Sequence, residues 1–384
     1  MKQVLEIINL PGSAANFIGN QFSYLQQHGD FEMHLICSDG PQLADFANEQ
    51  KIKYKPIELN RQLTPLKDLK ALRAICKYIR TNHIDVVISH QAKARLLGTT
   101  AAWLTGVPRR IVFAHGVLYE TMSGVTRWLV KTNDKLVSAL STDVVCVSQF
   151  VMKTREHDHI DQPKKRHILH KGSCNGIDTK NKFNPDLVDN QDIIAIKEKL
   201  GVLENSFVVG FCGRLVKDKG VVELVDAIKM LVNKHPEKSI KLLIIGSPEK
   251  RDAIPQATLD WINNSSSVIF TGLIPYTDIQ KYYLLMNVFV LPSHRDGLGM
   301  VPLEAQAMGI PAIVSKITGC AETIDDGVTG HYCDLTPESI SSAVELFFDK
   351  DKQRNMGAAG RQFVQKNFER ELVNHAMLDL LNGK

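Results

Sequence analysis

The sequence alternates short, mainly apolar runs with amphipathic stretches, and this alternation limits the folds that it can adopt. Ten such runs read as strands: Val4–Ile8, Met33–Cys37, Val86–Ser89, Arg110–Ala114, Val144–Val147, Val208–Cys212, Lys241–Ile245, Val268–Phe270, Val288–Leu291 and Ala312–Val314. Strands that are buried on both faces have this pattern, and the stretches between them leave room for helical crossovers. The sequence therefore predicts an α/β protein with parallel sheets covered by helices.

A chain of 384 residues is long enough for two such domains. The alternating pattern weakens between 164 and 192, where Pro, Gly, Asn and Asp residues gather. We predict a first domain over 1–175 and a second over 190–365, each a doubly wound, Rossmann-like sheet. The helix at about 366–384 is a candidate to pack back on the first domain. Ligands of such sheets bind at the carboxyl ends of the strands, so two facing sheets would line a cleft.

One predicted helix, Pro65–Thr81, has both an apolar and a basic side. The apolar side is expected to be a buried stripe formed by Leu66, Leu69, Leu72, Cys76 and Ile79. The basic side consists of Lys70, Arg73, Lys77 and Arg80. A solvated helix face is the ordinary interpretation of such basic residues, and peripheral contact with an anionic membrane is the functional one.

Composition narrows the classes of function. A formal net charge of +4 with a pI near 8.5 does not support bulk nucleic-acid binding. The 7 cysteines are widely spaced and odd in number, which predicts reduced thiols in a cytoplasmic protein. Met1–Leu10 is expected to be a first strand rather than a signal peptide, and no apolar run reaches the roughly 20 residues of a membrane span. Any membrane contact would be peripheral, on the inner face of the cell membrane.

The first motif with chemical content is the segment Gly210–Gly220, which joins a strand to a helix. It carries Arg214, Lys217 and Lys219 close to the start of the helix. Glycine lets a backbone approach a ligand, a helix N-terminus favours anions, and arginine can clasp two oxygens. A diphosphate is the expected ligand, and a surface turn with solvated bases is the alternative.

The second motif is the segment Ser293–Pro311, in which a glycine-bearing loop leads into a helix predicted at about 302–308. Asp296 lies on the loop, and Glu304 is placed in the first turn of the helix, where the helix dipole favours a carboxylate. Two carboxylates directed at one crevice suit a ligand with many hydroxyl groups, such as a ribose or a sugar. The alternative is a helix cap beside a solvated acid.

Together the two motifs resemble those of retaining GT-B glycosyltransferases of family 4, the group that includes bacterial capsule, lipopolysaccharide and lipid-linked glycan enzymes. The family pattern Gly-Arg-Leu-x-x-x-Lys-Gly is similar to Gly213–Gly220, and the pattern from Glu-Gly-x-Gly to Gly-x-Pro is similar to Asp296–Pro311. Further similarities lie at Asn175–Pro185, at His115 with the following glycine, and at Ser315–Gly330, and those of the first domain are the weaker ones. The resemblance covers nearly the whole chain and implies the GT-B fold.

One position departs from the family pattern. Asp296 stands where the family usually has glutamate, which keeps the charge and shortens the side chain by one methylene. This difference implies either an adjusted recognition of the donor sugar or an impaired enzyme.

The resemblance implies four catalytic residues. Arg214 and Lys219 hold the donor diphosphate and stabilise the charge that develops as it leaves. Asp296 faces the transferred sugar, and His115 lies beside the reacting carbon. No protein nucleophile is assigned, because in the front-face mechanism usually proposed for the family the donor phosphate accepts the acceptor's proton.

The resemblance also implies a set of substrate-binding residues, in which Glu304 binds the ribose and Leu273 meets the nucleobase. Gly12 and Ser13, placed in the loop after the first strand, are expected near the diphosphate. The full set is Gly12, Ser13, Gly213, Leu273, Gly297, Leu298, Gly299, Met300, Glu304 and Glu322.

The expected reaction is transfer of a hexose or N-acetylhexosamine from a nucleotide sugar, with uridine as the expected base, to a saccharide acceptor that is expected to be polyprenyl-linked. No metal and no cofactor beyond this donor are expected; His157–His159 and Asp349–Asp351 imitate metal motifs but read as solvated turns. The segments Pro11–Ile18 and His115–Gly124 are candidates for acceptor contact. A GT-B-fold sugar-nucleotide epimerase and a nucleotide-sugar-binding protein without catalysis remain the alternatives.

Overall fold

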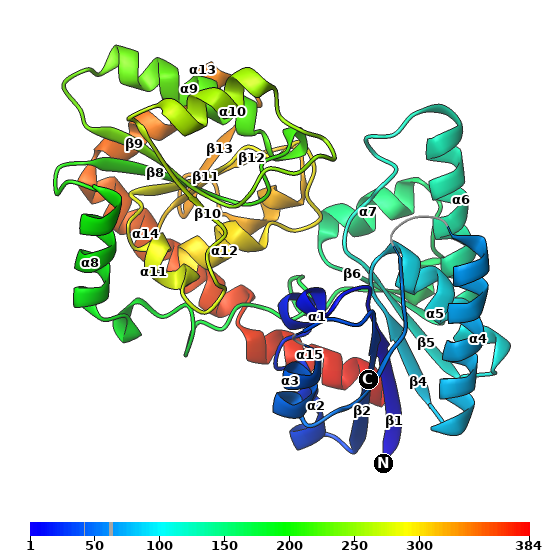
Figure 1. Ribbon diagram of the computed structural model, residues 1–384. Helices are drawn as coiled ribbons and strands as arrows, with labels where there is room; N and C mark the ends of the chain where they lie inside the picture. Colours follow the sequence, from blue (N-terminus) through cyan, green and yellow to red (C-terminus); the bar gives the residue numbers. More distant parts are fainter. Residues whose placement is uncertain (42, 61–63) are drawn as a thin grey trace. The chain divides into compact units, whose positions relative to one another are not determined.

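The computed structural model describes residues 1–41, 43–60 and 64–384. The chain forms two compact units: the first comprises 1–176 and 371–384, and the second comprises 177–370. Each unit contains one parallel sheet with helices packed against it (Figure 1).

The described residues of the first unit form a seven-stranded parallel sheet in the order β3-β2-β1-β4-β5-β6-β7. Its strands are β1 (Lys2–Ile7), β2 (Phe31–Cys37), β3 (Lys53–Pro56), β4 (Val86–Ser89), β5 (Arg109–Ala114), β6 (Asp143–Cys146) and β7 (Arg166–His167). The sequence order reverses between β1 and β4, as it does in doubly wound nucleotide-binding folds. The carboxyl ends of β1 and β4 therefore meet at a topological switch point.

The helices of the first unit connect these strands. They are α1 (Pro11–Phe17), α2 (Gln21–His28), α3 (Leu43–Gln50), α4 (Pro65–Thr81), α5 (Ala92–Leu104), α6 (Gly124–Leu140), α7 (Gln149–His157) and the short 3-10 turn η1 (Pro163–Lys165). The chain also returns to this unit at its end through α15 (Arg370–Asn382). The side-chain amide of Gln21 on α2 donates to Asn374 Oδ1 on α15 over 3.0 Å, and both side chains are buried.

The described residues of the second unit form a six-stranded parallel sheet in the order β10-β9-β8-β11-β12-β13. Its strands are β8 (Phe207–Cys212), β9 (Ile240–Ile245), β10 (Val268–Gly272), β11 (Val288–Leu291), β12 (Ala312–Ser315) and β13 (Gly330–Cys333). Its helices are α8 (Asn190–Leu200), α9 (Val221–Lys234), α10 (Gln256–Asn264), α11 (Ile279–Tyr283), α12 (Met300–Ala307), α13 (Pro337–Glu345) and α14 (Lys350–Asn367). Its 3-10 turns are η2 (Pro185–Leu187), η3 (Lys217–Lys219), η4 (Gly319–Thr323) and η5 (Leu346–Phe348). The switch point of this sheet lies between β8 and β11.

The predicted α/β class, with two doubly wound parallel sheets, is confirmed, and all ten predicted strands are present with small shifts of their ends. The sequence pattern missed β3, β7 and β13. β3 is an exposed edge strand with two lysines, β7 has 2 residues, and β13 begins with Gly-His-Tyr. None of these segments carries the continuous apolar run of a strand that is buried on both faces.

The predicted buried stripe of α4 is wrong in part. The buried residues of this helix are Ala71, Ile75 and Ile79, which recur every four residues and join the core between the helix and the sheet. Leu66 and Leu69, expected inside, are 87% and 44% exposed. Leu72 and Cys76, also expected inside, are partly buried against the same core, whereas Leu66 and Leu69 share the outer side with basic residues.

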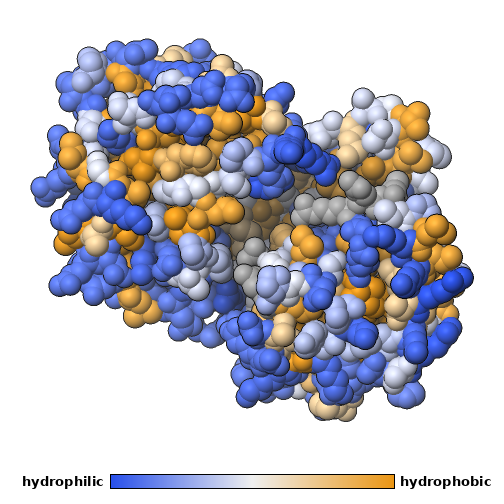
Figure 2. Space-filling view, viewed as in Figure 1, coloured by the Kyte–Doolittle hydropathy of each residue, from blue (hydrophilic) through white to orange (hydrophobic). Residues whose placement is uncertain are grey.

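The surface of the first unit over α4 mixes hydrophobic residues with strongly hydrophilic ones (Figure 2). Within the described part of the chain, no helix combines the length and apolar character that crossing a bilayer requires.

Candidate active site

The switch point of the second sheet brings the two sequence motifs together. β8 and β11 are neighbours in the sheet, with Val288 beside Val209 and Phe289 beside Gly210. The segment after β8 is the basic turn, and the segment after β11 is the loop with the predicted acid. Because both strands run in the same direction, both segments leave the same edge of the sheet.

Gly220 fixes how closely these two segments approach. It has a left-handed backbone with φ of 68° and precedes α9 directly. A Cβ atom at this position would lie 1.9 Å from the carbonyl oxygen of Pro292. The backbone N–H of His294 also donates to the carbonyl oxygen of Asp218 over 2.8 Å. Glycine is therefore required both by its backbone conformation and by contact with the neighbouring loop.

An ion pair joins the two motifs across this contact. Lys219 Nζ lies 2.6 Å from Asp296 Oδ2, and each side chain is 17% exposed. Lys219 closes the 3-10 turn η3, and Asp296 lies on the loop after β11. The structure thus brings Lys219, which was predicted to bind the diphosphate, next to Asp296, the acid that was predicted to face the transferred sugar.

Arg214, the other predicted cation, has a different partner. Its Nη1 atom lies 3.0 Å from Glu249 Oε2, in a pair whose side chains are 52% and 35% exposed. Glu249 follows β9, the other neighbour of β8, and it was missed in the sequence. The available signal was an acid just beyond a buried strand. Its pairing with Arg214 depends on the strand order, which the sequence alone does not give.

Glu304 occupies a buried position, but not in the first helical turn as predicted. α12 begins at Met300, so Glu304 is its fifth residue. Its Oε2 atom accepts a hydrogen bond of 2.8 Å from the hydroxyl of Tyr283. Burial raises the pKa of Glu304 to about 7, while Tyr283, Lys182 and Arg370 favour the ionised form. Tyr283, on α11, was not identified from the sequence.

The loop between Asp296 and α12 rests against the turn η4. A Cβ atom on Gly319 would lie 1.9 Å from the carbonyl oxygen of Gly297, and the N–H of Gly319 donates to the carbonyl of Asp296 over 3.1 Å. Leu298 is buried, and Gly299 is the N-cap of α12, so Met300 provides its first helical residue. Gly297 is thus held against η4, and the following residues lead from it into α12.

Of the other predicted residues of the second unit, two lie at strand ends and one on a 3-10 turn. Gly213 directly follows β8 and donates its N–H to the carbonyl of Ile245 over 2.9 Å. Leu273 directly follows β10 and is 77% exposed. Glu322 lies on η4 and is half-buried.

The first sheet has its own cluster at the switch point between β1 and β4. Gly12 and Ser13 were predicted in a loop, but they lie in the first turn of α1, which begins at Pro11. Proline is favoured at this position because its fixed φ suits a helix start. Gln91, which follows β4, donates from Nε2 to Ser13 Oγ over 3.1 Å. Gln91 has a φ of 59°, an uncommon backbone for a residue other than glycine, and was missed in the sequence.

His115 follows β5 and belongs to a chain of hydrogen-bonded side chains. Its Nε2 atom lies 3.1 Å from His90 Nδ1, and His90 Nε2 lies 3.0 Å from Glu6 Oε2. Burial lowers the pKa of both imidazoles, that of His90 to about 3, so both rings are neutral near pH 7. Burial also raises the pKa of the Glu6 carboxyl to about 8. Glu6 and His90 were not identified from the sequence, where Glu6 interrupts the apolar run of β1.

The two segments that imitate metal motifs have other partners. Asp158 lies 2.8 Å from Lys131, and Asp349 caps α14 by accepting from the N–H groups of Asp351 and Lys352. Over the described residues, no group of three or more His, Cys, Asp or Glu side chains is arranged to hold a metal ion.

Comparisons with known proteins show which family the chain resembles. The family "Glycosyl transferases group 1" matches residues 192–363, and the family "Glycosyl transferase 4-like" matches residues 8–146. A capsular polysaccharide biosynthesis glycosyltransferase of Staphylococcus aureus is 30% identical over 94% of this chain and 92% of its own length. A galactosyltransferase of Escherichia coli, described as UDP-Gal:alpha-D-GlcNAc-diphosphoundecaprenol alpha-1,3-galactosyltransferase, is 27% identical over 90% of this chain and 85% of its own length.

Solved structures share the whole fold. HepE of Anabaena, in complex with UDP and glucose, aligns over 100% of both chains with a TM-score of 0.83 and 17% identity. A glycosyltransferase of Rickettsia africae aligns over 100% of this chain and 98% of its own with a TM-score of 0.80 and 19% identity. Two parallel doubly wound sheets with these neighbours define the GT-B class of fold. The chain belongs to the group 1 family of glycosyltransferases and is a glycosyltransferase. These relatives favour a transferase over the epimerase that the sequence left open.

Proposed function

We propose that this enzyme transfers a hexose or N-acetylhexosamine from a UDP-sugar to a polyprenyl-linked saccharide, in the assembly of a bacterial surface polysaccharide or glycan. The names of two relatives support this proposal, since one is a capsular polysaccharide enzyme and the other acts on a diphosphoundecaprenol-linked sugar. The observation that carries the proposal is the Lys219–Asp296 pair at the switch point of the second sheet, because it puts a cation for the diphosphate beside an acid for a sugar.

Donor binding is assigned to the second domain, 190–365, and acceptor binding to the first, 1–175. Arg214 and Lys219 bind the diphosphate, and Glu304 binds the ribose hydroxyls, for which its buried position beside Tyr283 is suited. Both cations are paired with carboxylates, so a diphosphate must share or displace Glu249 at Arg214 and Asp296 at Lys219. Exposed Leu273 is available to contact the base.

The proposed reaction proceeds with retention of the anomeric configuration. The bond between the sugar C1 and the β-phosphate oxygen breaks while the acceptor hydroxyl attacks C1 from the same face. The acceptor's proton passes to a β-phosphate oxygen, and a nucleoside diphosphate leaves. Lys219 and Arg214 stabilise the charge that builds up on the leaving group. His115 is assigned to the transferred sugar, and no protein nucleophile takes part.

A transfer assay tests this proposal. The enzyme is incubated with labelled UDP-hexoses and UDP-N-acetylhexosamines, with and without a polyprenyl-diphosphate-linked monosaccharide. We expect the label to reach the lipid only when both substrates are present, and the new linkage to keep the donor's anomeric configuration in its NMR spectrum. Epimerisation of the donor without acceptor, or tight donor binding without turnover on any lipid-linked acceptor, would contradict the proposal.

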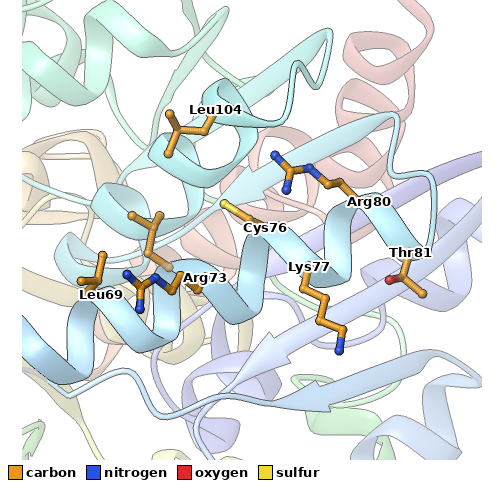
Figure 3. Close-up of a pocket in the computed structure, with 8 residues that line it drawn as sticks. Leu69, Arg73, Cys76, Lys77, Arg80, Thr81 and Leu104 are labelled. Carbon is orange, nitrogen blue, oxygen red and sulfur yellow. The ribbon is translucent and has the colours of Figure 1, made fainter.

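We further propose that α4 holds the enzyme on the inner face of the cell membrane. Four exposed basic side chains, Lys70, Arg73, Lys77 and Arg80, lie on a helix that also exposes Leu66 and Leu69. A shallow groove of about 580 Å³ runs between α4 and the end of α5 and is lined by Leu69, Leu72, Arg73, Cys76, Lys77, Arg80, Thr81 and Leu104. Cys76 and Arg80 extend from α4 on the side of Leu104 (Figure 3). Apolar and basic groups on one surface suit an anionic lipid interface, where each cation contributes about 1 kcal/mol.

Vesicle sedimentation tests this contact. We expect the protein to bind vesicles that contain phosphatidylglycerol at low salt, and the double variant Arg73→Glu/Lys77→Glu to lose most of that binding. A control with the same change of charge, Lys199→Glu/Lys366→Glu, alters exposed residues of the second unit and should bind as the unchanged protein does. Equal binding by both double variants would remove α4 from the proposal.

A further inference from the structure

Three side chains from three adjacent strands form a continuous hydrogen-bonded chain in the first unit. Glu6 lies within β1, His90 follows β4, and His115 follows β5, and these strands are neighbours in the order β1-β4-β5. The Glu6–His90 distance is 3.0 Å and the His90–His115 distance is 3.1 Å, in each case between nitrogen or oxygen atoms. Glu6 and His90 are buried, and His115 is half-buried. We call these three residues the carboxyl–imidazole relay.

Aromatic rings pack against both imidazoles of the relay. The ring of Phe113 stacks on His90 at a centroid distance of 4.6 Å, and the ring of Phe17 lies 4.7 Å from that of His115. In the part of the chain that the structure describes, Glu6 Oε1 is buried without a hydrogen-bond partner. The hydrogen bond between Glu6 Oε2 and His90 therefore links the carboxyl to the other two members of the relay.

Other ionisable groups face the relay from neighbouring elements. Burial is the main cause that lowers the pKa of both histidines, and Arg95 on α5 adds to it; Arg95 is itself paired with Asp134 on α6 at 2.8 Å. The Cys174 thiol is buried near Glu6, and burial raises its pKa to about 12, so it stays neutral. With both imidazoles neutral, the carboxyl of Glu6 is the member of the relay that titrates near neutral pH, at about 8.

The relay has two self-consistent hydrogen-bond patterns, which differ by one proton. When Glu6 is protonated, its Oε2–H donates to His90 Nε2, and His90 Nδ1–H donates to His115 Nε2. The proton of His115 is then on Nδ1. When Glu6 is ionised, His90 Nε2–H donates to the carboxylate and His90 Nδ1 accepts from His115 Nε2–H. His115 Nδ1 is then an acceptor.

We propose that Glu6 and His90 are positioning residues that decide which nitrogen of His115 carries the proton. The exchange between the two patterns moves the proton of Glu6 to His90, the proton of His90 to His115 Nε2, and the proton of His115 Nδ1 to solvent, so that one proton is released in all. Neighbouring hydrogen bonds set the tautomer of a neutral imidazole in this way. The buried carboxyl thereby controls a half-buried ring to which it has no direct contact.

The consequence for catalysis rests on the proposed role of His115 at the transferred sugar. With Glu6 protonated, His115 Nδ1–H is a neutral donor that can hydrogen-bond to an oxygen of the donor substrate. With Glu6 ionised, this donor is lost. The protonated relay is therefore the active form, and turnover declines as Glu6 ionises.

Nitrogen-15 NMR of histidine-labelled protein without substrate tests the relay directly. We assign the His115 signals by their loss in His115→Gln. We expect the proton of His115 to shift from Nδ1 to Nε2 with a midpoint near pH 8, and Glu6→Gln, whose amide does not titrate, to show one tautomer from pH 6 to 9.5. Glu32→Gln, a control on the neighbouring strand β2, should keep the shift. Failure of the native protein to show the shift, or its persistence in Glu6→Gln, would overturn the proposal.

Two further measurements guard against ambiguity. If Glu6→Gln does not fold, His90→Gln interrupts the relay at its middle and should abolish the pH-dependent shift of His115. The pH profile of kcat should show an alkaline decline near pH 8 in the native enzyme and a flatter profile in Glu6→Gln. A tautomer shift with unchanged kcat profiles would support the relay and contradict the assignment of His115 to the sugar, which separates failure of this inference from failure of the proposed function.

Discussion

The two switch points of the molecule have the same strand topology and opposite chemistry. In the second unit the switch between β8 and β11 carries half-exposed or partly buried ion pairs, Lys219–Asp296 and Arg214–Glu249. In the first unit the switch between β1 and β4 carries Glu6 and His90, which are buried and neutral. The topology supplies a place where loops converge, and the side chains decide what that place binds. Fixed charges suit an anion, and a neutral relay suits a directed hydrogen bond.

The largest effect is expected from Lys219→Met. This change removes a cation from the proposed diphosphate site and leaves Asp296 without the partner that lies 2.6 Å away. Loss of a single preorganised group that stabilises developing charge lowers kcat by about 10²- to 10³-fold. Lys217→Met, which removes an exposed lysine of the same turn, is the matched control and should retain most activity. Equal losses in both variants would mean that only the overall charge of the turn matters.

The next effect concerns the close contact on which the second switch point depends. Gly220→Ala forces a side chain into a left-handed backbone with φ of 68° and places Cβ 1.9 Å from the carbonyl oxygen of Pro292. Gly201→Ala is the control, because Gly201 has a φ of 65° with open space around it. We expect the control to lower the free energy of unfolding by about 1–2 kcal/mol and Gly220→Ala to lower it by clearly more, as measured with urea. Equal losses of unfolding free energy in the two variants would show that the contact with Pro292 does not add to the cost of Gly220→Ala.

The pH dependence of stability should distinguish the two regions. A carboxyl whose pKa is raised by folding keeps its proton in the native state after the unfolded chain has lost it, so stability falls as pH rises through that window. The window runs from about 4.5 to about 8 for Glu6 and from about 4.5 to about 7 for Glu304. Between pH 7 and 9 the free energy of unfolding should fall in the native protein and in Glu304→Gln, and less steeply in Glu6→Gln. The same slope of unfolding free energy against pH in all three proteins would contradict the raised pKa of Glu6.

The smallest effect is expected from Glu249→Gln. This change frees Arg214 from an exposed ion pair, and such pairs contribute about 0–1 kcal/mol. Binding of UDP, measured by calorimetry at low salt, should strengthen by no more than about fivefold. Weaker binding would show that Glu249 orients Arg214 toward the ligand rather than competing with it.

The residues that meet at the second switch point could be selected from the sequence because they lie in two local motifs. Lys219 and Asp296 each follow a strongly apolar strand, and such strands are recognised from the sequence. Glu304 was identified, but its place in the helix was not, because Pro302 is compatible with more than one start of α12. Likewise Pro11 begins α1, where the sequence suggested a loop.

The first switch point was largely hidden from the sequence. Glu6 and His90 are separated by 84 positions, and their contact arises only because β1 and β4 are neighbours in the sheet. Glu249 was missed for the same reason. The buried face of α4 was also hidden in part, since its core contacts use Ala71, whose small side chain gives little signal in a pattern of hydrophobic periodicity. What remains hidden in each case is the pairing of distant segments.

Calorimetric titration of UDP into three forms of the protein shows whether the switch point of the second sheet holds the nucleotide diphosphate. We expect the native protein and Glu6→Gln to bind UDP with the same affinity, because the relay acts on His115, which is assigned to the transferred sugar that UDP lacks. Lys219→Met should bind UDP at least tenfold more weakly. Unchanged affinity in Lys219→Met, or an equal loss in Glu6→Gln, would contradict the claim that the switch point of the second sheet holds the nucleotide diphosphate.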